Sequence, residues 1–278
     1  MDYKRKIDSA IKLLRNIPQD GPIEVSYSGG KDSDIILELA KMAGIPFEAI
    51  YKNTTIDPPG TIKHCKDNGV TIIQPEVSFL QLIERKGVPT RRARFCCEVL
   101  KEYKIHDRAI QGIRREESTA RSKRYKEPEM CRLYPHGKKA RIYLPILEWT
   151  LEDATRFIEE RGIKCAPKYY DKDGNFHPER RLGCLGCPLK ADAGKADFMQ
   201  YPNLLKAWIR SADKYLQTHQ HCSAFRKFKD GYRLMTHDLF FDSYDAYEKV
   251  FGDNQLFPEQ VPDAKAFLEG QFKHDLTI

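Results

Sequence analysis

The chain has 278 residues, of which 41% are hydrophobic and 31% charged, and its formal net charge is +7. A chain of this length and composition forms one large or two modest soluble globular domains. No uninterrupted apolar run approaches the roughly 20 residues of a membrane-spanning helix, so we expect no membrane partner. Ile7, Ala10 and Leu14 recur at helical spacing among charges, which predicts an amphipathic N-terminal helix rather than a signal peptide. Eight cysteines without a secretory signal favour a reducing compartment, and we expect a cytoplasmic protein.

The next feature is a polar loop between a strand and a helix. An apolar run at 23–27 predicts the strand, and residues 34–40 resume with helical spacing. Two glycines let backbone N–H groups approach an anion, and the start of the helix favours a phosphate. A lysine adds a mobile charge and two serines add hydroxyl donors. The sequence therefore predicts a phosphate-binding loop, distinct from the longer Walker loop, made of Ser28, Gly29, Gly30, Lys31, Asp32 and Ser33.

Strands and helices continue to alternate along the chain. Further strands are expected at 47–52, 70–74, 109–113 and 141–147, with helices between them. Alternation of this kind predicts an α/β fold with a doubly wound, mostly parallel sheet. Asp57 lies in the polar loop after the strand at 47–52, where such sheets place ligand contacts. It is a candidate for a magnesium ion or a ribose hydroxyl, although Asp before Pro is also ordinary turn chemistry.

Arginines follow the strand at 109–113. Arg114 and Arg115 lie where that strand ends, a suitable place for a phosphate or sulfate group. They begin a segment, 114–141, that holds ten Lys or Arg against four Glu. A solvated loop explains this segment without any function, while a basic surface also suits nucleotides or nucleic acid.

The pattern of apolar residues changes near residue 190. After this point no strand pattern is visible, and apolar residues recur at helical spacing. We therefore predict two regions. Residues 1–190 would form a nucleotide-binding catalytic domain with a cysteine cluster, and residues 191–278 a helical C-terminal region.

Four cysteines form two close pairs. Cys184 and Cys187 are spaced to hold one metal from a tight turn, and the adjacent Cys96 and Cys97 would complete four thiolates. Four sulfur ligands suit either structural zinc or an iron–sulfur cluster. Cys165 is a further candidate because it precedes the Cys-x-x-Cys turn. The alternative is that all of these are reduced thiols packed in the core.

These motifs together resemble a known family. Ser-Gly-Gly-Lys-Asp-Ser is similar to the PP-loop of the ATP pyrophosphatases, which split ATP between its α and β phosphates. Residues 20–190 resemble the phosphoadenosine phosphosulfate (PAPS) reductase family within that group, in the order phosphate loop, Cys-Cys pair, Gly-Ile-Arg-Arg-Glu, Pro-Ile-Leu-Glu-Trp, Tyr-Tyr-Asp and Gly-Cys-x-x-Cys. The nearest resemblance is to DNA phosphorothioation-type sulfurtransferases and to [4Fe-4S] adenosine phosphosulfate (APS) reductases.

The resemblance implies a cofactor. A [4Fe-4S] cluster would have Cys96, Cys97, Cys184 and Cys187 as first-choice ligands, with Cys165 as a replacement for one of the pair and Zn²⁺ as the alternative metal. Two departures bear on the activity. Residues 267–278 lack the C-terminal cysteine with which sulfonucleotide reductases attack sulfate. The phosphate loop is intact, whereas it tends to be degraded in those reductases.

The resemblance and its departures favour one function. We expect an ATP pyrophosphatase that adenylates an acceptor for sulfur transfer, with ATP and Mg²⁺ as cofactors. The acceptor would be a nucleic acid, as in DNA phosphorothioation, and the partners a sulfur-donor protein such as a cysteine desulfurase and other modification-complex subunits. The expected catalytic residues are Lys31, Asp32, Ser33, Arg114 and Arg115.

Two alternative functions stay open. The first is a sulfonucleotide reductase of sulfate assimilation, for which Cys222, close to His221 and Arg226, is the C-terminal thiol to consider. The second is a non-catalytic subunit that binds ATP or nucleic acid, which would suit the basic segment 114–141.

Overall fold

The computed structural model describes residues 2–252 and 261–278. It divides into two compact units, each built from two stretches of chain. The sheet unit comprises Met1–Pro75 and Glu98–Gly183, and the helical unit comprises Glu76–Cys97 and Cys184–Ile278.

The described residues of the sheet unit form a six-stranded sheet in the order β3-β2-β1-β4-β6-β5. Neighbouring strands are parallel except for the pair β5 and β6, which is antiparallel. The predicted doubly wound, mostly parallel sheet is therefore confirmed. Its strands are β1 (Ile23–Tyr27), β2 (Glu48–Lys52), β3 (Thr71–Ile73), β4 (Arg108–Gln111), β5 (Glu129–Leu133) and β6 (Lys139–Tyr143).

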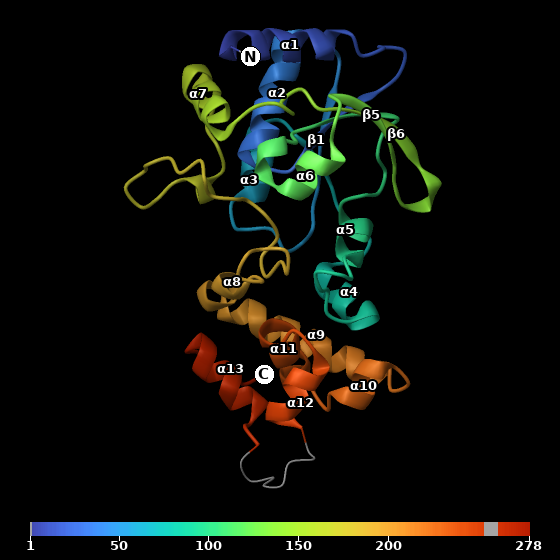
Figure 1. Ribbon diagram of the computed structural model, residues 1–278, viewed down its shortest axis with the longest axis vertical. Helices are drawn as coiled ribbons and strands as arrows, with labels where there is room; N and C mark the ends of the chain where they lie inside the picture. Colours follow the sequence, from blue (N-terminus) through green and yellow to red (C-terminus); the bar gives the residue numbers. More distant parts are fainter. Residues whose placement is uncertain (1, 253–260) are drawn as a thin grey trace. The chain divides into compact units, whose positions relative to one another are not determined.

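Helices cover one face of this sheet around α2 (Lys31–Ala43). Figure 1 shows α1 (Tyr3–Arg15) and α7 (Leu151–Arg161) beside α2, and both pack against it. The core between these helices and the sheet is apolar and buried, and includes Leu14, Val25, Ile36 and Phe157. α3 (Thr61–Asp67) adds Cys65 to the same cluster.

The other face of the sheet carries a second, smaller core. Ile142 of β6 belongs to it, whereas the next residue, Tyr143, faces the α2 side, because successive side chains of a strand point to opposite faces. Tyr125, directly after α6 (Thr119–Arg124), and Tyr134 also pack there. Near β1 and β2 this face is polar instead, since Glu24 and Lys52 are buried on it.

The helical unit joins an early segment of the chain to the C-terminal helices. Phe79 of α4 (Phe79–Lys86) contacts Trp208 of α9 (Pro202–Thr218), with ring centroids 4.9 Å apart, and Phe198 contacts the same tryptophan at 5.2 Å. Burial of these rings explains why 76–97 belongs to this unit, while the sequence placed it in the first domain and the boundary at 190 instead of 184. The remaining helices are α8 (Lys195–Gln200), α10 (Ser223–Lys227), α11 (Gly231–Phe240), α12 (Tyr244–Phe251) and α13 (Ala264–Phe272), and α5 (Phe95–Leu100) begins in this unit.

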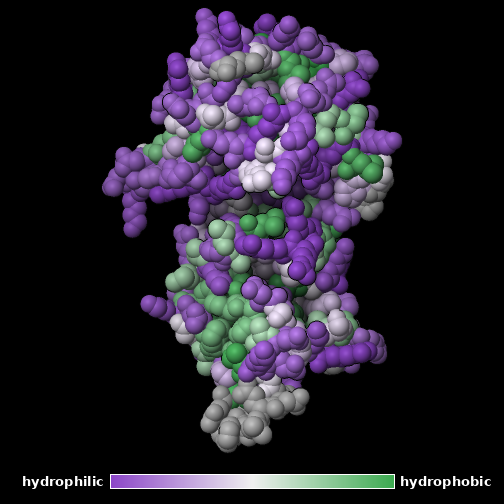
Figure 2. Space-filling model, in the orientation of Figure 1, coloured by the Kyte–Doolittle hydropathy of each residue, from purple (hydrophilic) through white to green (hydrophobic). Residues whose placement is uncertain are grey.

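Figure 2 shows hydrophilic residues over most of the visible face of the sheet unit. Among the residues that the structure describes, no helix is long and apolar enough to cross a membrane.

Candidate active site

The predicted phosphate loop connects β1 to α2. Gly29 has a φ of +76°, and a Cβ at this position would lie 2.9 Å from Thr61 Cγ2, so both its backbone and its surroundings require glycine. Ser33 Oγ donates a hydrogen bond of 2.6 Å to the carbonyl of Gly30, and Ser28 Oγ donates one of 3.3 Å to Ser33 Oγ. The loop is thus held in a tight turn that leads directly into the first turn of α2.

Tyr169 supports this loop from a distant part of the sequence. The backbone N–H of Lys31 donates a 3.1 Å hydrogen bond to Tyr169 Oη, and the Lys31 ammonium lies 5.6 Å from the centroid of the tyrosine ring. Tyr169 is itself buried. The start of α2 is therefore fixed by a residue from the Tyr-Tyr-Asp motif, 138 positions along the chain.

Lys31 and Arg114, two buried cations, form a charged group at the loop with the partly buried Asp32. Lys31 is 4% exposed and Arg114 3% exposed. Asp32 lies between them, with its Oδ2 3.5 Å from Lys31 Nζ and its Oδ1 accepting a 2.8 Å hydrogen bond from Arg114 Nε. Burial lowers the pKa of Lys31, and the Asp32 carboxylate opposes this shift. Lys31 and Arg114 are two cations in a poorly solvated place beside the loop, which suits an anionic ligand.

The close approach of β4 to α2 brings Arg114 to this position. Gly112 follows β4, and a Cβ on it would lie 2.6 Å from the carbonyl oxygen of Asp32. Only a residue without a side chain allows the two backbones to lie so close. Arg114 Nη1 also donates a 3.0 Å hydrogen bond to Glu116, which holds the guanidinium in place.

A cavity of about 220 Å³ opens beside the loop on the polar face of the sheet. Ser28 of the loop and Asp57 both line it. The Asp57 carboxylate accepts hydrogen bonds from the hydroxyl of Tyr51 and, at 3.3 Å, from the N–H of Thr54. Asp57 and Ser28, one residue of the predicted loop, therefore line the same cavity.

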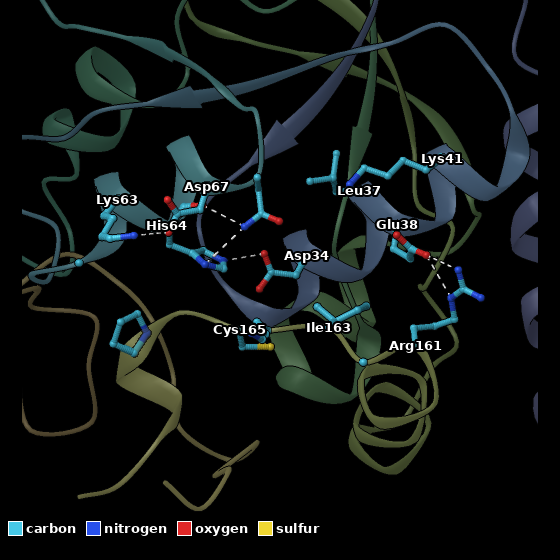
Figure 3. Close-up of a pocket in the computed structure, with 15 residues that line it drawn as sticks. Asp34, Leu37, Glu38, Lys41, Lys63, His64, Asp67, Arg161, Ile163 and Cys165 are labelled. Atoms are coloured by element: carbon cyan, nitrogen blue, oxygen red, sulfur yellow. Dashed lines mark hydrogen bonds and ion pairs between the residues drawn. The ribbon is translucent and has the colours of Figure 1, made fainter.

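A larger cavity of about 540 Å³ lies elsewhere in the sheet unit (Figure 3). It is lined by α2, α3 and residues 161–167, and none of residues 28–33 lines it. At its centre Asp34 Oδ1 lies 2.9 Å from His64 Nε2, with Cys165 close by. Burial raises the pKa of both Asp34 and Cys165. Cys165 thus lies buried in the sheet unit, a different unit from the one that holds the other four candidate cysteines.

The two cysteine pairs belong to the helical unit. Cys96 lies within electrostatic range of Cys184 and Cys187, and its pKa is raised mainly by a hydrogen bond with the Cys97 side chain, then by burial and the neighbouring thiols. Arg94 Nη2 lies 3.6 Å from Cys97 Sγ and donates a hydrogen bond to it. Cys96 is thus near the other three cysteines of the predicted set, and the set itself stays a prediction. In 2–252 and 261–278, however, no group of three or more His, Cys, Asp or Glu side chains is arranged to hold a metal ion.

Arg91 ties the two cysteine-bearing segments together. Its guanidinium donates hydrogen bonds to the carbonyl oxygens of Pro188, at 2.9 Å, and Lys190, at 3.0 Å, directly after the Cys-x-x-Cys turn. This contact involves only protein groups. Arg91, one of three arginines in residues 91–94, is therefore a structural brace.

Comparison with known proteins identifies the family. Residues 22–190 match the phosphoadenosine phosphosulfate reductase domain, and they make up more than half of the chain. The chain belongs to this family. Members of the PAPS reductase family are enzymes of the PP-loop group and bind nucleotides such as ATP. Use of ATP and Mg²⁺ fits this family.

Individual relatives of this PAPS reductase family chain are distant. An uncharacterised protein of Methanocaldococcus jannaschii, MJ0973, is 31% identical over 205 residues, which cover 67% of this chain and 46% of that protein. Sulfate adenylyltransferase subunit 2 of Agrobacterium fabrum is 26% identical over 202 residues, or 59% of this chain and 62% of that one. The chain thus spans about half to three fifths of the length of these relatives. The solved PAPS reductase of Candida auris gives a TM-score of 0.43 at 15% identity, covering 59% of this chain and 87% of that one.

Two further arginines of the domain lie near the loop, although the sequence analysis did not select them. Burial lowers the pKa of Arg121, and the positive charges of Arg181 and Arg114 add to the shift. Arg181 also lowers the pKa of Lys31. Both Arg121 and Arg181 pair with Glu117, at 3.8 Å for Arg181. Arg121 is one of ten cations in the basic segment and Arg181 precedes the cysteine turn, but neither position alone distinguishes a loop contact from a solvated charge.

Arg115 lies apart from the group formed by Arg114 and the loop. Its Nε donates a 2.8 Å hydrogen bond to the carbonyl of Tyr125, and Nη1 pairs with Glu148. The two adjacent arginines point to different partners. In this structure Arg115 braces the turn after α6. Its contacts with Tyr125 and Glu148 give no support to the catalytic role expected for it.

Proposed function

We propose that this protein is an ATP pyrophosphatase that adenylates an acceptor oxygen in preparation for sulfur transfer. The observation that carries the proposal is the Lys31, Asp32 and Arg114 group at the start of α2. Preorganised cations in a poorly solvated site stabilise charge that develops in a transition state. The intact glycine loop supplies backbone N–H groups for the same phosphates.

The proposed reaction has two displacements. ATP enters as its magnesium complex, with the β and γ phosphates at Ser28–Ser33 and the α-phosphate facing the acceptor. The acceptor oxygen attacks the α-phosphorus, the bond to the bridging α–β oxygen breaks, and pyrophosphate leaves with both electrons of that bond. Lys31 and Arg114 neutralise the leaving group. A sulfur nucleophile from a donor protein, such as a cysteine desulfurase, then attacks the activated acceptor and displaces AMP.

Asp32 would act as a positioning residue in this scheme. Its two oxygens hold the Lys31 ammonium and the Arg114 guanidinium on opposite sides of one carboxylate. Arg121 and Arg181 extend the positive charge beyond these two cations. Arg121 and Arg181, which share Glu117, are the cations that a second anionic partner would meet beside the triphosphate.

We propose a nucleic acid as this second partner, with transfer of sulfur to DNA as the form that the sequence resemblance favours. The supporting feature is the basic segment 114–141, in which Lys123 and Arg124 of α6 and the following Lys126 are exposed. Phosphate contacts of Lys and Arg make such binding depend steeply on salt. Filter binding of single- and double-stranded DNA and of tRNA across a salt series tests this partner. If no nucleic acid binds even at low salt, the proposal of a nucleic-acid partner is wrong.

A pyrophosphate-release assay tests the enzymatic proposal. Purified protein is incubated with MgATP and each candidate nucleic acid, and ATP binding is measured by calorimetry on the same samples. Lys31→Met should abolish pyrophosphate release, whereas Lys41→Met, which removes an exposed lysine of the same helix, should leave it unchanged. Wild-type protein that neither binds ATP nor releases pyrophosphate would overturn the proposal. Tight ATP binding without turnover, with acceptor present, would favour the non-catalytic subunit.

We also propose that Cys96, Cys97, Cys184 and Cys187 are the ligands of an iron–sulfur cluster or of zinc. Their gathering in one unit supports this set. The residues do not fit a bound metal in their present arrangement, so no step above runs through a cluster. Protein purified without oxygen should be coloured and absorb visible light, or contain zinc by elemental analysis, and Cys184→Ser should lose the metal. Metal-free wild-type protein with an unchanged fold would exclude both.

A sulfonucleotide reductase is the second candidate, since the matching family is described by that activity. It needs a nucleophilic thiol, and Cys222 is half-buried in the helical unit, beside Tyr215. Thiol-dependent release of sulfite from APS or PAPS would favour this reading. If Cys222→Ser left such release intact, Cys222 would be excluded as the nucleophile.

A further inference from the structure

The polar face of the sheet holds an arrangement of side chains that the proposed reaction does not use. Lys52 is the last residue of β2 and Gln111 the last residue of β4, and β1 lies between these two strands. The parallel register places Ser26 opposite both Ile50 and Gln111. Because side chains alternate along a strand, Lys52, two positions after Ile50, lies on the same face as Gln111. Both residues line the 220 Å³ cavity that Ser28 and Asp57 also line.

Lys52 has hydrogen-bonding capacity left for a ligand. It is 8% exposed, and its Nζ lies 3.5 Å from Glu24 Oε1 and 5.8 Å from the centroid of the Tyr103 ring. An ammonium group carries three donors, so a single long contact to Glu24 leaves donors for a further acceptor. Burial without full pairing is unfavourable for this charge and lowers the pKa of Lys52.

Glu24, by contrast, is fully held by the protein. Its Oε1 accepts a 2.8 Å hydrogen bond from Ser26 Oγ, and its Oε2 accepts one of 3.1 Å from the N–H of His106. The carboxylate is 1% exposed. It therefore fixes the Lys52 ammonium at the cavity wall instead of offering itself to a ligand.

Gln111 presents the complementary group. Its Nε2 donates a 2.8 Å hydrogen bond to Tyr134 Oη, which orients the amide, and its Oε1 accepts no hydrogen bond from the described residues. The cavity thus has a donor from β2 and an acceptor from β4 on its wall. Ile50 and Ile105 supply apolar lining, as the faces of an aromatic ring require.

We propose that Lys52 and Gln111 read the adenine base of the nucleotide, with Lys52 donating to a ring nitrogen and Gln111 Oε1 accepting from the 6-amino group. Adenine presents an acceptor nitrogen beside this amino donor, and the two protein groups match that pair. The inference rests on the proposed function, in which ATP is the substrate. Ser28 links the cavity to the phosphate loop, so a base in the cavity leaves its phosphates at the start of α2.

Binding measurements with two ligands separate this inference from the proposed function. Calorimetry is done with ATP and with inorganic tripolyphosphate, which occupies the loop alone, on wild-type protein, Lys52→Met, Gln111→Leu and the control Lys41→Met. We expect Lys52→Met and Gln111→Leu each to weaken ATP about tenfold, since each removes one hydrogen bond to the base. Tripolyphosphate should bind all four proteins equally, and Lys41→Met should match wild type for both ligands.

A modified nucleotide tests the assignment of Gln111 directly. Purine riboside triphosphate lacks the 6-amino group, so wild-type protein should bind it about tenfold more weakly than ATP, while Gln111→Leu should bind the two equally. Gln111→Glu keeps an acceptor oxygen and should retain the preference for ATP. Thermal melting shows which variants fold, and the analogue comparison uses wild-type protein in any case.

Several results would overturn the inference. One is wild-type protein that binds ATP and purine riboside triphosphate equally. Another is a loss of tripolyphosphate affinity in Lys52→Met that matches its loss of ATP affinity, which would make Lys52 a phosphate contact. If ATP binding persists in these cases, the proposed function stands without the base-reading pair. Wild-type protein that binds neither ATP nor tripolyphosphate would overturn both.

Discussion

Arg114 donates a 2.8 Å hydrogen bond from Nε to Oδ1 of Asp32, and these two residues lie 82 positions apart in the chain. The contact joins the end of β4 to the start of α2, at the carboxyl edge of the sheet. Parallel sheets with helices on both faces bind ligands at this edge, where neighbouring strands connect in opposite directions. β1 and β4 are such neighbours, because the chain continues from β1 to β2 on one side and from β4 to β5 and β6 on the other.

Replacement of Arg114 by Gln should reduce the kcat/KM of pyrophosphate release by about 100-fold or more, the usual effect of removing one preorganised charge donor from a transition state. ATP binding should weaken less, because Lys31 and the loop remain. Arg156→Gln removes an exposed helical arginine and serves as the matched control. A rate for Arg114→Gln equal to that of Arg156→Gln would contradict the role of Arg114.

Replacing Arg114 and Asp32 together separates the structural contribution of this ion pair from its catalytic contribution. Arg114→Gln alone leaves Asp32 with the Lys31 ammonium as its remaining partner, so some loss of stability is expected. The double variant with Asp32→Asn removes both charges and should recover part of that stability in urea denaturation. Its pyrophosphate release should stay as low as that of the single variant.

Replacement of Gly112 by Ala should destabilise the sheet unit by about 1–3 kcal/mol, the range for overpacking. The added Cβ would lie 2.6 Å from the Asp32 carbonyl oxygen, and backbone atoms cannot move aside cheaply. Gly270→Ala is the control, since it lies in α13 with nothing within 4 Å of its Cβ position. In a helix interior that change should stabilise by about 0.5–1 kcal/mol. Equal unfolding midpoints for both variants would contradict the close approach.

The sequence predicts the loop and most of the sheet because those features are local. The turn before α2 needs glycine, and the capping box that starts α7 needs only Thr150 and Asp153, three residues apart. β5 was missed, since its burial alternates only between partly buried and exposed and its residues 129–133 lie in a segment rich in charge. An edge strand with one half-buried face gives a weak pattern.

The contacts of several site residues could not be predicted, because their partners are distant in the sequence. Adjacent arginines 114 and 115 look equivalent in the sequence, yet one contacts Asp32 and the other the carbonyl of Tyr125. Which side of the backbone faces the loop depends on how β4 packs against α2, which no local pattern contains. Cys165 illustrates the same limit, because its position before the cysteine turn says nothing of its burial beside Asp34.

Tyr169→Phe should weaken ATP and tripolyphosphate binding to a similar extent, by about threefold to tenfold. The change keeps the ring over the Lys31 ammonium but removes the hydroxyl that accepts the Lys31 N–H at 3.1 Å. A buried N–H left without an acceptor costs about 1–3 kcal/mol, and the first turn of α2 would shift to regain a partner. Calorimetry with both ligands checks this. A loss confined to ATP would point to a contact with the nucleoside instead.

Asp171 should make stability depend on pH in the acid range. Hydrogen bonds from the side chains of His177 and Asn175 and from nearby backbone N–H groups lower the pKa of Asp171 below its ordinary value of 3.8. A carboxyl group with a depressed pKa in the folded state contributes stability that is complete above its unfolded pKa and is lost as pH falls toward the folded one. Urea denaturation of wild type and Asp171→Asn between pH 6 and pH 2 measures this contribution. We expect wild type to be the more stable at pH 6 and the difference to shrink below pH 4. A difference that is constant over the whole series would show that the ionised form of Asp171 gives the loop no extra stability.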